Sequence, residues 1–333
     1  MPRRRLLATL DAGLGGHATL VCAPAGFGKS SIVSQWIETI DRPVAWLALD
    51  PAIDDPRWFL MHLAETIRRV APGTLEVVTQ MVQAPVLPDL AVVIPELSNE
   101  LDELAQPIVV VLDDYHRITS PSVHTIMSEL IAHPNGAVHF VIVSRYEPPL
   151  QIRALRVRGQ LAQLRMSDLA FDRNEVELFA KQLMPREWLD RELQELYATT
   201  EGWPAGVRLA IEAQRLSGDA ELIGVGFLDQ ATQDDLLAEI LESAPATVRR
   251  YVQVASLFPS FSAELCDAAI ADRLSGPATM TGSEFIDWLR RYNLFVVQLD
   301  NEGVWYRFHH LFARLLDNWR AVQAPDPQAV AQE

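Results

Sequence analysis

A glycine-rich run ending in Gly28, Lys29 and Ser30 has the composition of a phosphate-binding loop. It follows an apolar stretch at 18–22 and precedes an amphipathic segment. Successive backbone N–H groups at such a helix start form a positive concavity for phosphate. The lysine then contacts the β- and γ-phosphates, and the serine hydroxyl coordinates Mg²⁺. We therefore expect these residues to bind nucleotide: Pro24, Ala25, Gly26, Phe27, Gly28, Lys29, Ser30 and Ser31.

One position of this loop departs from the Walker A pattern. Ala23 stands where G-x-x-x-x-G-K-[ST] has its first glycine. The alternative interpretation is a Gly-Lys-Ser sequence that occurs by chance at a helix start and binds no ligand. The apolar run before the loop and the amphipathic run after it favour the phosphate loop.

Two carboxylates, Asp113 and Asp114, end a second apolar run at 108–112. Five consecutive apolar residues are typical of a strand that is buried on both faces of a parallel sheet. We expect Asp113 to hold Mg²⁺ through water, with Ser30 as the other metal-binding residue, and Asp114 to polarise the attacking water. A buried strand that runs into an acidic turn without a ligand is the alternative.

A third strand-like run, at 137–143, is followed by Ser144 and Arg145. In open α/β sheets, ligands bind outside the carboxyl ends of the strands. The three runs therefore deliver their polar residues to one edge of the sheet. Arg145 is our candidate for sensing the γ-phosphate.

The composition is that of an ordinary soluble globular protein. With 333 residues, 49% of them hydrophobic, the chain is long enough for two or three domains. No apolar run approaches the ~20 residues of a membrane span, and no signal peptide is recognisable, so we expect a cytoplasmic protein without membrane contact. We expect Cys22 and Cys266 to be core residues. A formal net charge of −16 argues against nucleic-acid binding by this segment.

The order of elements predicts an α/β P-loop NTPase sheet followed by helices. Up to about residue 155, strand-like runs such as 44–49 alternate with helical periods such as 58–67, which is typical of a parallel sheet covered on both faces. Further helices are predicted at 173–183, 188–198, 205–216, 234–242, 246–258 and 283–292, and a β-hairpin at 294–308. Helices followed by a hairpin suggest a winged helix.

These elements predict four segments along the chain. We expect a nucleotide-binding domain at 1–160, a helical domain at 161–226, a winged-helix domain at 227–321 and a disordered tail at 322–333, with a junction within 217–226.

Several motifs together resemble the ATPase module of MalT-type, large ATP-binding LuxR-family transcriptional regulators, which belong to the STAND class of signalling ATPases. They occur in family order over nearly the whole chain, and a small residue at the position of Ala23 is usual in this family. The matching stretches are the loop at 23–30, Leu112-Asp-Asp-Tyr-His116, Ser144-Arg145, Pro148-Pro149-Leu150, Leu155-Arg-Val-Arg158, Leu169-Ala-Phe171, Glu201-Gly-Trp-Pro204 and His309-His-Leu-Phe312.

The resemblance implies a switch in which the three domains close over bound ADP and open with ATP, the open form associating with itself. It also implies that Pro204 contacts the adenine and that His309 contacts the β-phosphate of ADP. A pair of histidines, His309 and His310, that packs on the hairpin is the alternative for the latter role. Arg3 and Arg5 match the family's basic lead-in near the nucleotide, although a solvated charged N-terminus explains them equally well.

Three classes of function remain open from the sequence. The leading hypothesis is a signalling switch with slow ATP hydrolysis. A dedicated ATPase or kinase and an interaction module with a permanent structural ADP are the alternatives. Because family members continue into a tetratricopeptide-like sensor and a LuxR-type helix-turn-helix, we expect this chain to be a fragment whose DNA-binding region lies elsewhere.

Overall fold

The computed structural model describes residues 3–133, 136–217, 237–238, 241, 244–271, 280–292, 294–300 and 302–323. The chain divides into two compact units. The sheet unit contains residues 2–23 and 28–169, and the C-terminal unit contains residues 24–27 together with the chain from residue 170 onward. The short loop segment Pro24–Phe27 therefore groups with the C-terminal unit rather than with its neighbours in sequence.

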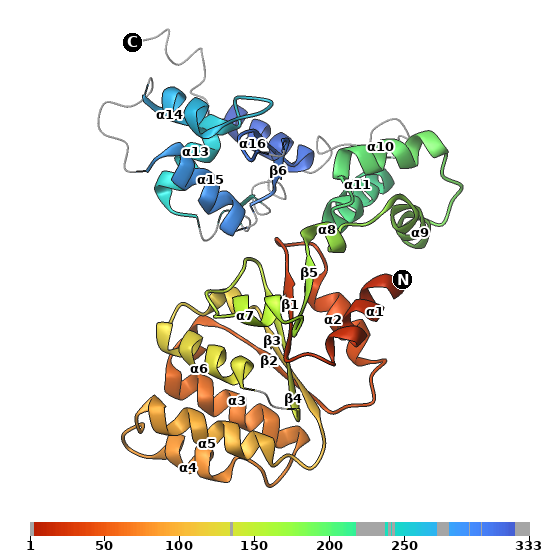
Figure 1. Cartoon of the computed structure of the whole chain (residues 1–333). Helices are drawn as coiled ribbons and strands as arrows, with labels where there is room; N and C mark the ends of the chain where they lie inside the picture. The colour runs from red at the N-terminus through yellow and green to blue at the C-terminus, as the bar shows by residue number, and fades with distance from the viewer. Residues whose placement is uncertain are drawn as a thin grey trace. The chain divides into compact units, whose positions relative to one another are not determined.

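A parallel sheet of five strands forms the centre of the sheet unit (Figure 1). The strands are β1 (Ala18–Cys22), β2 (Val44–Ala48), β3 (Ile108–Asp113), β4 (Val138–Ser144) and β5 (Leu161–Arg165), in the spatial order β2-β3-β4-β1-β5. Every neighbouring pair is parallel. β1, β3 and β4 are buried along their whole length, as expected for apolar runs that are covered on both faces. The predicted α/β fold class is confirmed.

Helices cover both faces of this sheet, with α3 to α6 on one side and α1 and α2 on the other (Figure 1). Alternate strand residues, such as Leu20, Val110 and Phe140, pack into one core cluster with Leu63 of α3. The helices are α1 (Arg4–Gly13), α2 (Lys29–Ile37), α3 (Pro56–Val70), α4 (Glu76–Gln83), α5 (Leu90–Asp102), α6 (Pro121–Ala132), α7 (Arg153–Val157) and α8 (Met166–Leu169), with short 3₁₀ turns at Pro51–Ile53 and Tyr115–Arg117.

The C-terminal unit is mainly helical and contains a small hairpin before its last described helix. Its helices are α9 (Arg173–Leu183), α10 (Asp190–Thr200), α11 (Pro204–Ser217), α13 (Ala246–Ala255), α14 (Ala263–Ala271), α15 (Gly282–Arg291) and α16 (His310–Gln323). Strands β6 (Val296–Gln298) and β7 (Tyr306–Phe308) pair antiparallel, which gives the predicted hairpin with shorter strands.

Helix bounds differ from the predicted ones where local side chains set the ends. α10 begins at Asp190 rather than Trp188, because the Glu192 carboxylate accepts a hydrogen bond from the Leu189 N–H and caps the helix there. Trp188 lies before the helix, with the Arg186 guanidinium 3.9 Å from its ring centroid.

Parts of three predicted segments lie outside the described residues. Of the predicted helix at 234–242, only residues 237, 238 and 241 are described. The junction at 217–226 is described only at its first residue, and the segment at 322–333 only at Val322 and Gln323, which end α16.

The two cysteines and the helices bear on the expectations about the core and the membrane. Cys22 and Cys266 are both buried, as predicted. In the described ranges, no helix combines the length and the apolar character that crossing a bilayer requires.

Candidate functional site

The glycine-rich loop links β1 to α2, which confirms the predicted order of strand, loop and helix. Gly26 and Gly28 adopt left-handed backbone angles, with φ of 76° and 74°, and such angles favour glycine. Gly28 is also the N-cap of α2 and supplies no side-chain cap to its first N–H groups. These N–H groups, at the positive end of the helix dipole, suit an anionic ligand.

The Lys29 side chain is buried at the start of α2, with 8% of its surface exposed. Burial, followed by the nearby charge of Arg145, lowers its pKa to about 8, while Asp114 and Asp113 act in the opposite direction. The charged groups predicted for the site therefore lie close enough to affect the Lys29 pKa: the Arg145 guanidinium and the carboxylates of Asp113 and Asp114. A buried ammonium group is best stabilised by an anionic partner.

The two predicted magnesium ligands are in contact. The Ser30 hydroxyl donates a hydrogen bond of 3.0 Å to Oδ1 of Asp113, and the backbone N–H of Asp114 donates to the same oxygen at 2.9 Å. Burial raises the pKa of the Asp113 carboxyl. Mg²⁺ prefers hard oxygen ligands, and the Ser30 hydroxyl and the Asp113 carboxylate place two such oxygens side by side. These residues therefore fit that ion.

The strand order explains why Arg145 lies near Lys29 and Asp113. β4 lies between β1, which leads into the loop, and β3, which ends at Asp113. Cys22 at the end of β1 is aligned with Ser144 at the end of β4, so Arg145 follows the strand between the loop and the acids.

Asp114 has a strained backbone and a partly exposed side chain. Its φ of 56° lies in the left-handed region, which is uncommon for a residue with a side chain. Its carboxylate is 45% exposed and lies 3.8 Å from Nδ1 of His116 and 4.0 Å from Nε of Arg117. Such strained residues cluster at functional sites.

His116 was not among the predicted site residues, although the structure places it beside them. Its side chain is only 10% exposed, and Nδ1 has no hydrogen-bond partner among the described residues. Burial lowers its pKa to about 3, and the charges of Arg145, Lys29 and Arg117 add to this effect. The imidazole is therefore neutral at pH 7. Its position directly after the two acids and a tyrosine was the available sequence signal, but a histidine in a motif does not reveal its surroundings.

The first half of the loop is held by residues of the C-terminal unit, to which it belongs. The indole N–H of Trp203 donates to the Ala25 carbonyl at 3.1 Å, and the Ala205 N–H donates to the Gly26 carbonyl at 3.1 Å. Phe27, with 2% of its surface exposed, packs against Trp203 and Phe295. Pro204, the predicted adenine contact, lies between the two donors as the first residue of α11.

His309, the predicted phosphate contact, is buried in the same unit with 4% of its surface exposed. Its ring meets those of Trp203 and Phe295 edge-on, and Nε2 lies 3.7 Å from Oε2 of Glu201. Burial lowers its pKa to about 4, so it is neutral at pH 7. Nδ1 has no hydrogen-bond partner in the described part of the chain. A buried polar atom of this kind is an opening for a ligand, although the neighbouring rings also fit the packing alternative.

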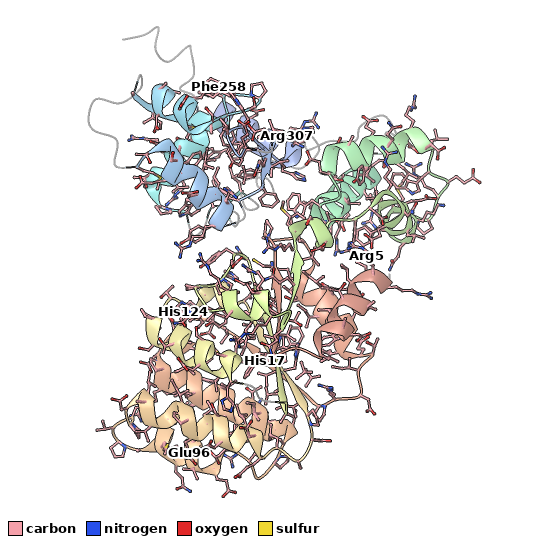
Figure 2. All side chains as sticks on the ribbon, in the orientation of Figure 1. Arg5, His17, Glu96, His124, Phe258 and Arg307 are labelled. Atoms are coloured by element: carbon pink, nitrogen blue, oxygen red, sulfur yellow. The ribbon has the colours of Figure 1, made fainter. Side chains whose placement is uncertain are left out.

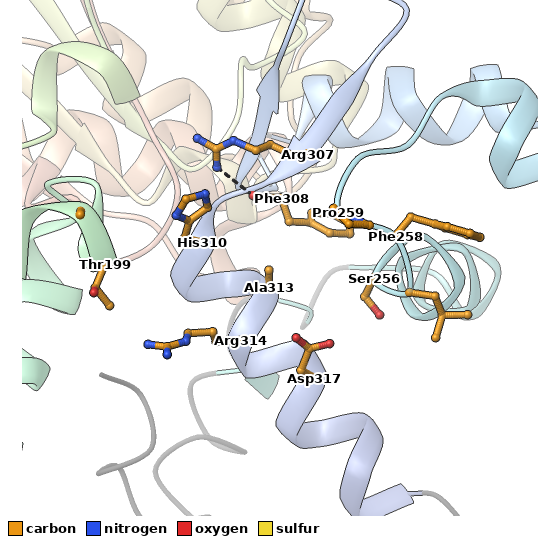
Figure 3. A pocket seen from close by; sticks show the side chains of 12 residues that line it. Thr199, Ser256, Phe258, Pro259, Arg307, Phe308, His310, Ala313, Arg314 and Asp317 are labelled. Carbon is orange, nitrogen blue, oxygen red and sulfur yellow. Dashed lines mark hydrogen bonds between the residues drawn. The ribbon is translucent and has the colours of Figure 1, made fainter. Parts of the chain in front are cut away.

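A pocket of about 620 Å³ lies elsewhere in the C-terminal unit, between the end of α10 and the start of α16 (Figure 3). Arg307 at its edge donates hydrogen bonds to the Phe308 carbonyl and to Glu201. Figure 2 labels two of its lining residues, Phe258 and Arg307. The pocket is lined by Ala198, Thr199, Ser256, Leu257, Phe258, Pro259, Arg307, Phe308, His310, Ala313, Arg314 and Asp317, none of which is a predicted site residue.

The basic N-terminus is tied to the sheet unit. Arg3 is buried and donates to the Leu169 carbonyl at 2.7 Å. Arg5, labelled in Figure 2, donates to the Asp168 carbonyl at 2.7 Å. These contacts anchor α1 to the segment that leads out of the sheet, and a role near the nucleotide stays a prediction.

The fold defines a P-loop ATPase architecture. A solved structure, the Walker-type ATPase of Pyrococcus abyssi, superposes with a TM-score of 0.66 at 15% identity over 95% of each chain, which shows the shared fold. Residues 237–328 match the family described as MalT winged helix domain. The predicted winged-helix fold after the sheet and helices is thereby confirmed.

Curated proteins of known sequence are more similar to this chain than that solved structure is. HTH-type transcriptional regulator MalT of Serratia proteamaculans is 30% identical over 94% of this chain and 34% of its own length. Serine/threonine-protein kinase PknK of Mycobacterium tuberculosis is 29% identical over 94% of this chain and 28% of its own length. The chain spans about a third of the length of these curated relatives. The chain is similar to MalT over nearly its whole length, as its motifs predicted, and its fold and relatives support a nucleotide-binding regulatory module.

Proposed function

We propose that this chain is the ATP/ADP-binding switch module of a MalT-like, STAND-class transcriptional regulator. The observation that carries the proposal is the contact between Ser30 and Asp113 beside the buried Lys29. It joins the hydroxyl at the end of the glycine-rich loop to the acid at the end of β3, which is separated from β1 by β4, and this is the pair that a nucleotide-bound Mg²⁺ requires.

Each residue of the sheet unit has a proposed part. The N–H groups at the start of α2 and the ammonium group of Lys29 bind the phosphates. Ser30 and Asp113 hold Mg²⁺, which when bound neutralises phosphate charge and orients the nucleotide. Asp114 polarises the attacking water, and Arg145 senses the γ-phosphate from the end of the strand between them. The neutral His116 adds a polar group that orients this water without adding charge.

In the C-terminal unit, Pro204 contacts the adenine and His309 donates an N–H to the β-phosphate of ADP. Nδ1 of His309 has no hydrogen-bond partner among the residues that the structure describes, which supports this role because a buried ring nitrogen without a hydrogen bond is costly unless a ligand satisfies it. Nucleotide-binding, helical and winged-helix domains at 1–160, 161–226 and 227–321 close over ADP and open with ATP, and the open form self-associates. Slow hydrolysis returns the closed form.

The two nucleotides must bind the two states with different affinities, because a ligand with equal affinity for both shifts nothing. Analytical ultracentrifugation of the purified chain with ADP, and with Mg²⁺ and a non-hydrolysable ATP analogue, tests this directly. We expect a compact monomer with ADP and larger species with the ATP analogue. Identical sedimentation under both conditions would contradict the switch and leave the permanent structural ADP as the better account.

A further inference from the structure

We infer that Trp203 is a positioning residue for the phosphate-binding loop, acting through the loop backbone rather than through the nucleotide. The inference rests on the proposed nucleotide binding and deepens it. In this inference, Trp203 sets the direction of the loop's N–H groups, although it lies 178 positions after Ala25 in the sequence.

The first step is the pair of hydrogen bonds to successive loop carbonyls. Trp203 donates to Ala25 O and Ala205 donates to Gly26 O, each at 3.1 Å. A peptide group is planar and trans, so each carbonyl points opposite to the N–H of the following residue. Holding these carbonyls therefore fixes the N–H directions of Gly26 and Phe27. Such N–H groups are what a phosphate loop offers its ligand.

The second step is the tight fit around this contact. Trp203 is fully buried, and a Cβ added to Gly26 would lie 2.7 Å from the indole nitrogen and 2.6 Å from Cβ of Ala205. The glycine is thus required by space as well as by its φ. The loop cannot shift towards the segment 203–205 without a clash. If it moved away, the hydrogen bonds from Trp203 and Ala205 would break.

The third step is the aromatic cluster that holds the indole in place. The Trp203 ring lies 5.1 Å from that of Phe295 and 6.5 Å from that of Phe27, and Phe27 and Phe295 are 6.0 Å apart between centroids. Phe295, just before β6, has a strained φ of 47°. Because rings of this size leave no room for other rotamers in a packed interior, the indole N–H keeps one direction. Phosphate affinity thereby depends on the packing of the C-terminal unit.

Trp203→Phe tests the inference, since it keeps a buried aromatic ring and removes only the N–H donor and part of the ring. Trp188→Phe is the matched control. Trp188 is also buried in the C-terminal unit, and its indole donates to the Met184 carbonyl at 3.2 Å, but within the described ranges it has no hydrogen bond or ring contact with the loop. Isothermal titration calorimetry with ADP gives the affinity, and thermal melts without nucleotide give the stability of each variant.

We expect Trp203→Phe to bind ADP about fivefold more weakly, the size of one lost hydrogen bond, while Trp188→Phe stays within about twofold of the wild type. The melting temperatures of the two variants should fall by similar amounts. Equal ADP affinity of all three proteins, or equal weakening in both variants, would overturn the inference, because a merely structural tryptophan predicts one of these results.

A second variant covers the case in which Trp203→Phe does not fold. Phe27→Leu keeps an apolar side chain and removes the ring that packs on Trp203, and we expect at least threefold weaker ADP binding. Unchanged binding would overturn the inference. A wild-type chain that binds no ADP would overturn the proposed function as well, so the two failures are distinguishable.

Discussion

Glu201 offers a quantitative prediction, because its carboxylate joins the end of α10 to the start of α16. It accepts a 2.8 Å hydrogen bond from Arg307, whose side chain is 24% exposed, and its own side chain is 22% exposed. The His310 N–H also donates to it at 3.3 Å. Charge-assisted hydrogen bonds of this kind contribute about 1.5–3 kcal/mol. Since the pair keeps some contact with water, we expect Glu201→Gln to lower the free energy of unfolding by about 2 kcal/mol at pH 7.

The pH dependence provides a second check on Glu201. Burial raises the pKa of its carboxyl, but the hydrogen bond from Arg307 and the electrostatic effects of His309 and Arg307 outweigh burial, so the folded-state pKa lies below the ordinary value of 4.5. The stability that the charge contributes is present above pH 4.5 and is lost as the pH falls through the lower folded-state pKa. The difference between wild type and Glu201→Gln should therefore vanish in acid.

Urea titrations followed by far-UV circular dichroism would measure both effects. Glu212→Gln is the matched control, because Glu212 pairs with Arg208 at 2.9 Å on an exposed helix face and should lose no more than about 0.5 kcal/mol. If Glu201→Gln were as stable as the wild type at pH 7, or if the control lost as much, the reasoning from burial and charge would be refuted.

Four further predictions concern the loop, the metal, the histidine and one glycine. Lys29→Ala should abolish ATP binding in equilibrium dialysis, because it removes the main cation for the phosphates; undiminished affinity would refute the loop assignment. Asp113→Ala should weaken the Mg²⁺ dependence of ATP binding, and an unchanged Mg²⁺ titration would contradict its role. His309→Ala should speed ADP dissociation in stopped-flow displacement, whereas an unchanged rate would support the packing role. Gly202→Ala should destabilise the protein by about 3 kcal/mol or more in thermal melts, because its Cβ would lie 2.1 Å from a carbonyl oxygen. Gly73→Ala, with a similar φ and nothing within 4 Å, should cost only about 1–2 kcal/mol, and equal losses would refute the steric argument.

The elements around the sheet-unit site were predictable because their signals are local. The run at 108–112 is apolar throughout and the run at 137–143 is apolar except for His139, and such composition is typical of a strand that is covered on both faces. β5 was missed because Leu161–Arg165 is an edge strand, only partly buried, with polar residues and no β-branched ones. α14 was missed for a different reason, since its nine residues show little amphipathic periodicity.

The contacts that the sequence could not predict are long-range. The contact between Ser30 and Asp113 is an exception, because two motifs with known roles predicted both residues as magnesium ligands. The contact of Trp203 with the loop joins residues 178 positions apart and has no local pattern. His116 lies 3.8 Å from Asp114, whose backbone is left-handed, and side-chain types alone reveal neither feature.

The most direct test of the proposed switch is to denature the purified chain and identify by chromatography the nucleotide that it releases. A closed module with a buried nucleotide predicts ADP in near-stoichiometric amount. Protein that releases none, and that binds added ADP and ATP only weakly, would keep the fold but contradict a nucleotide-locked resting state.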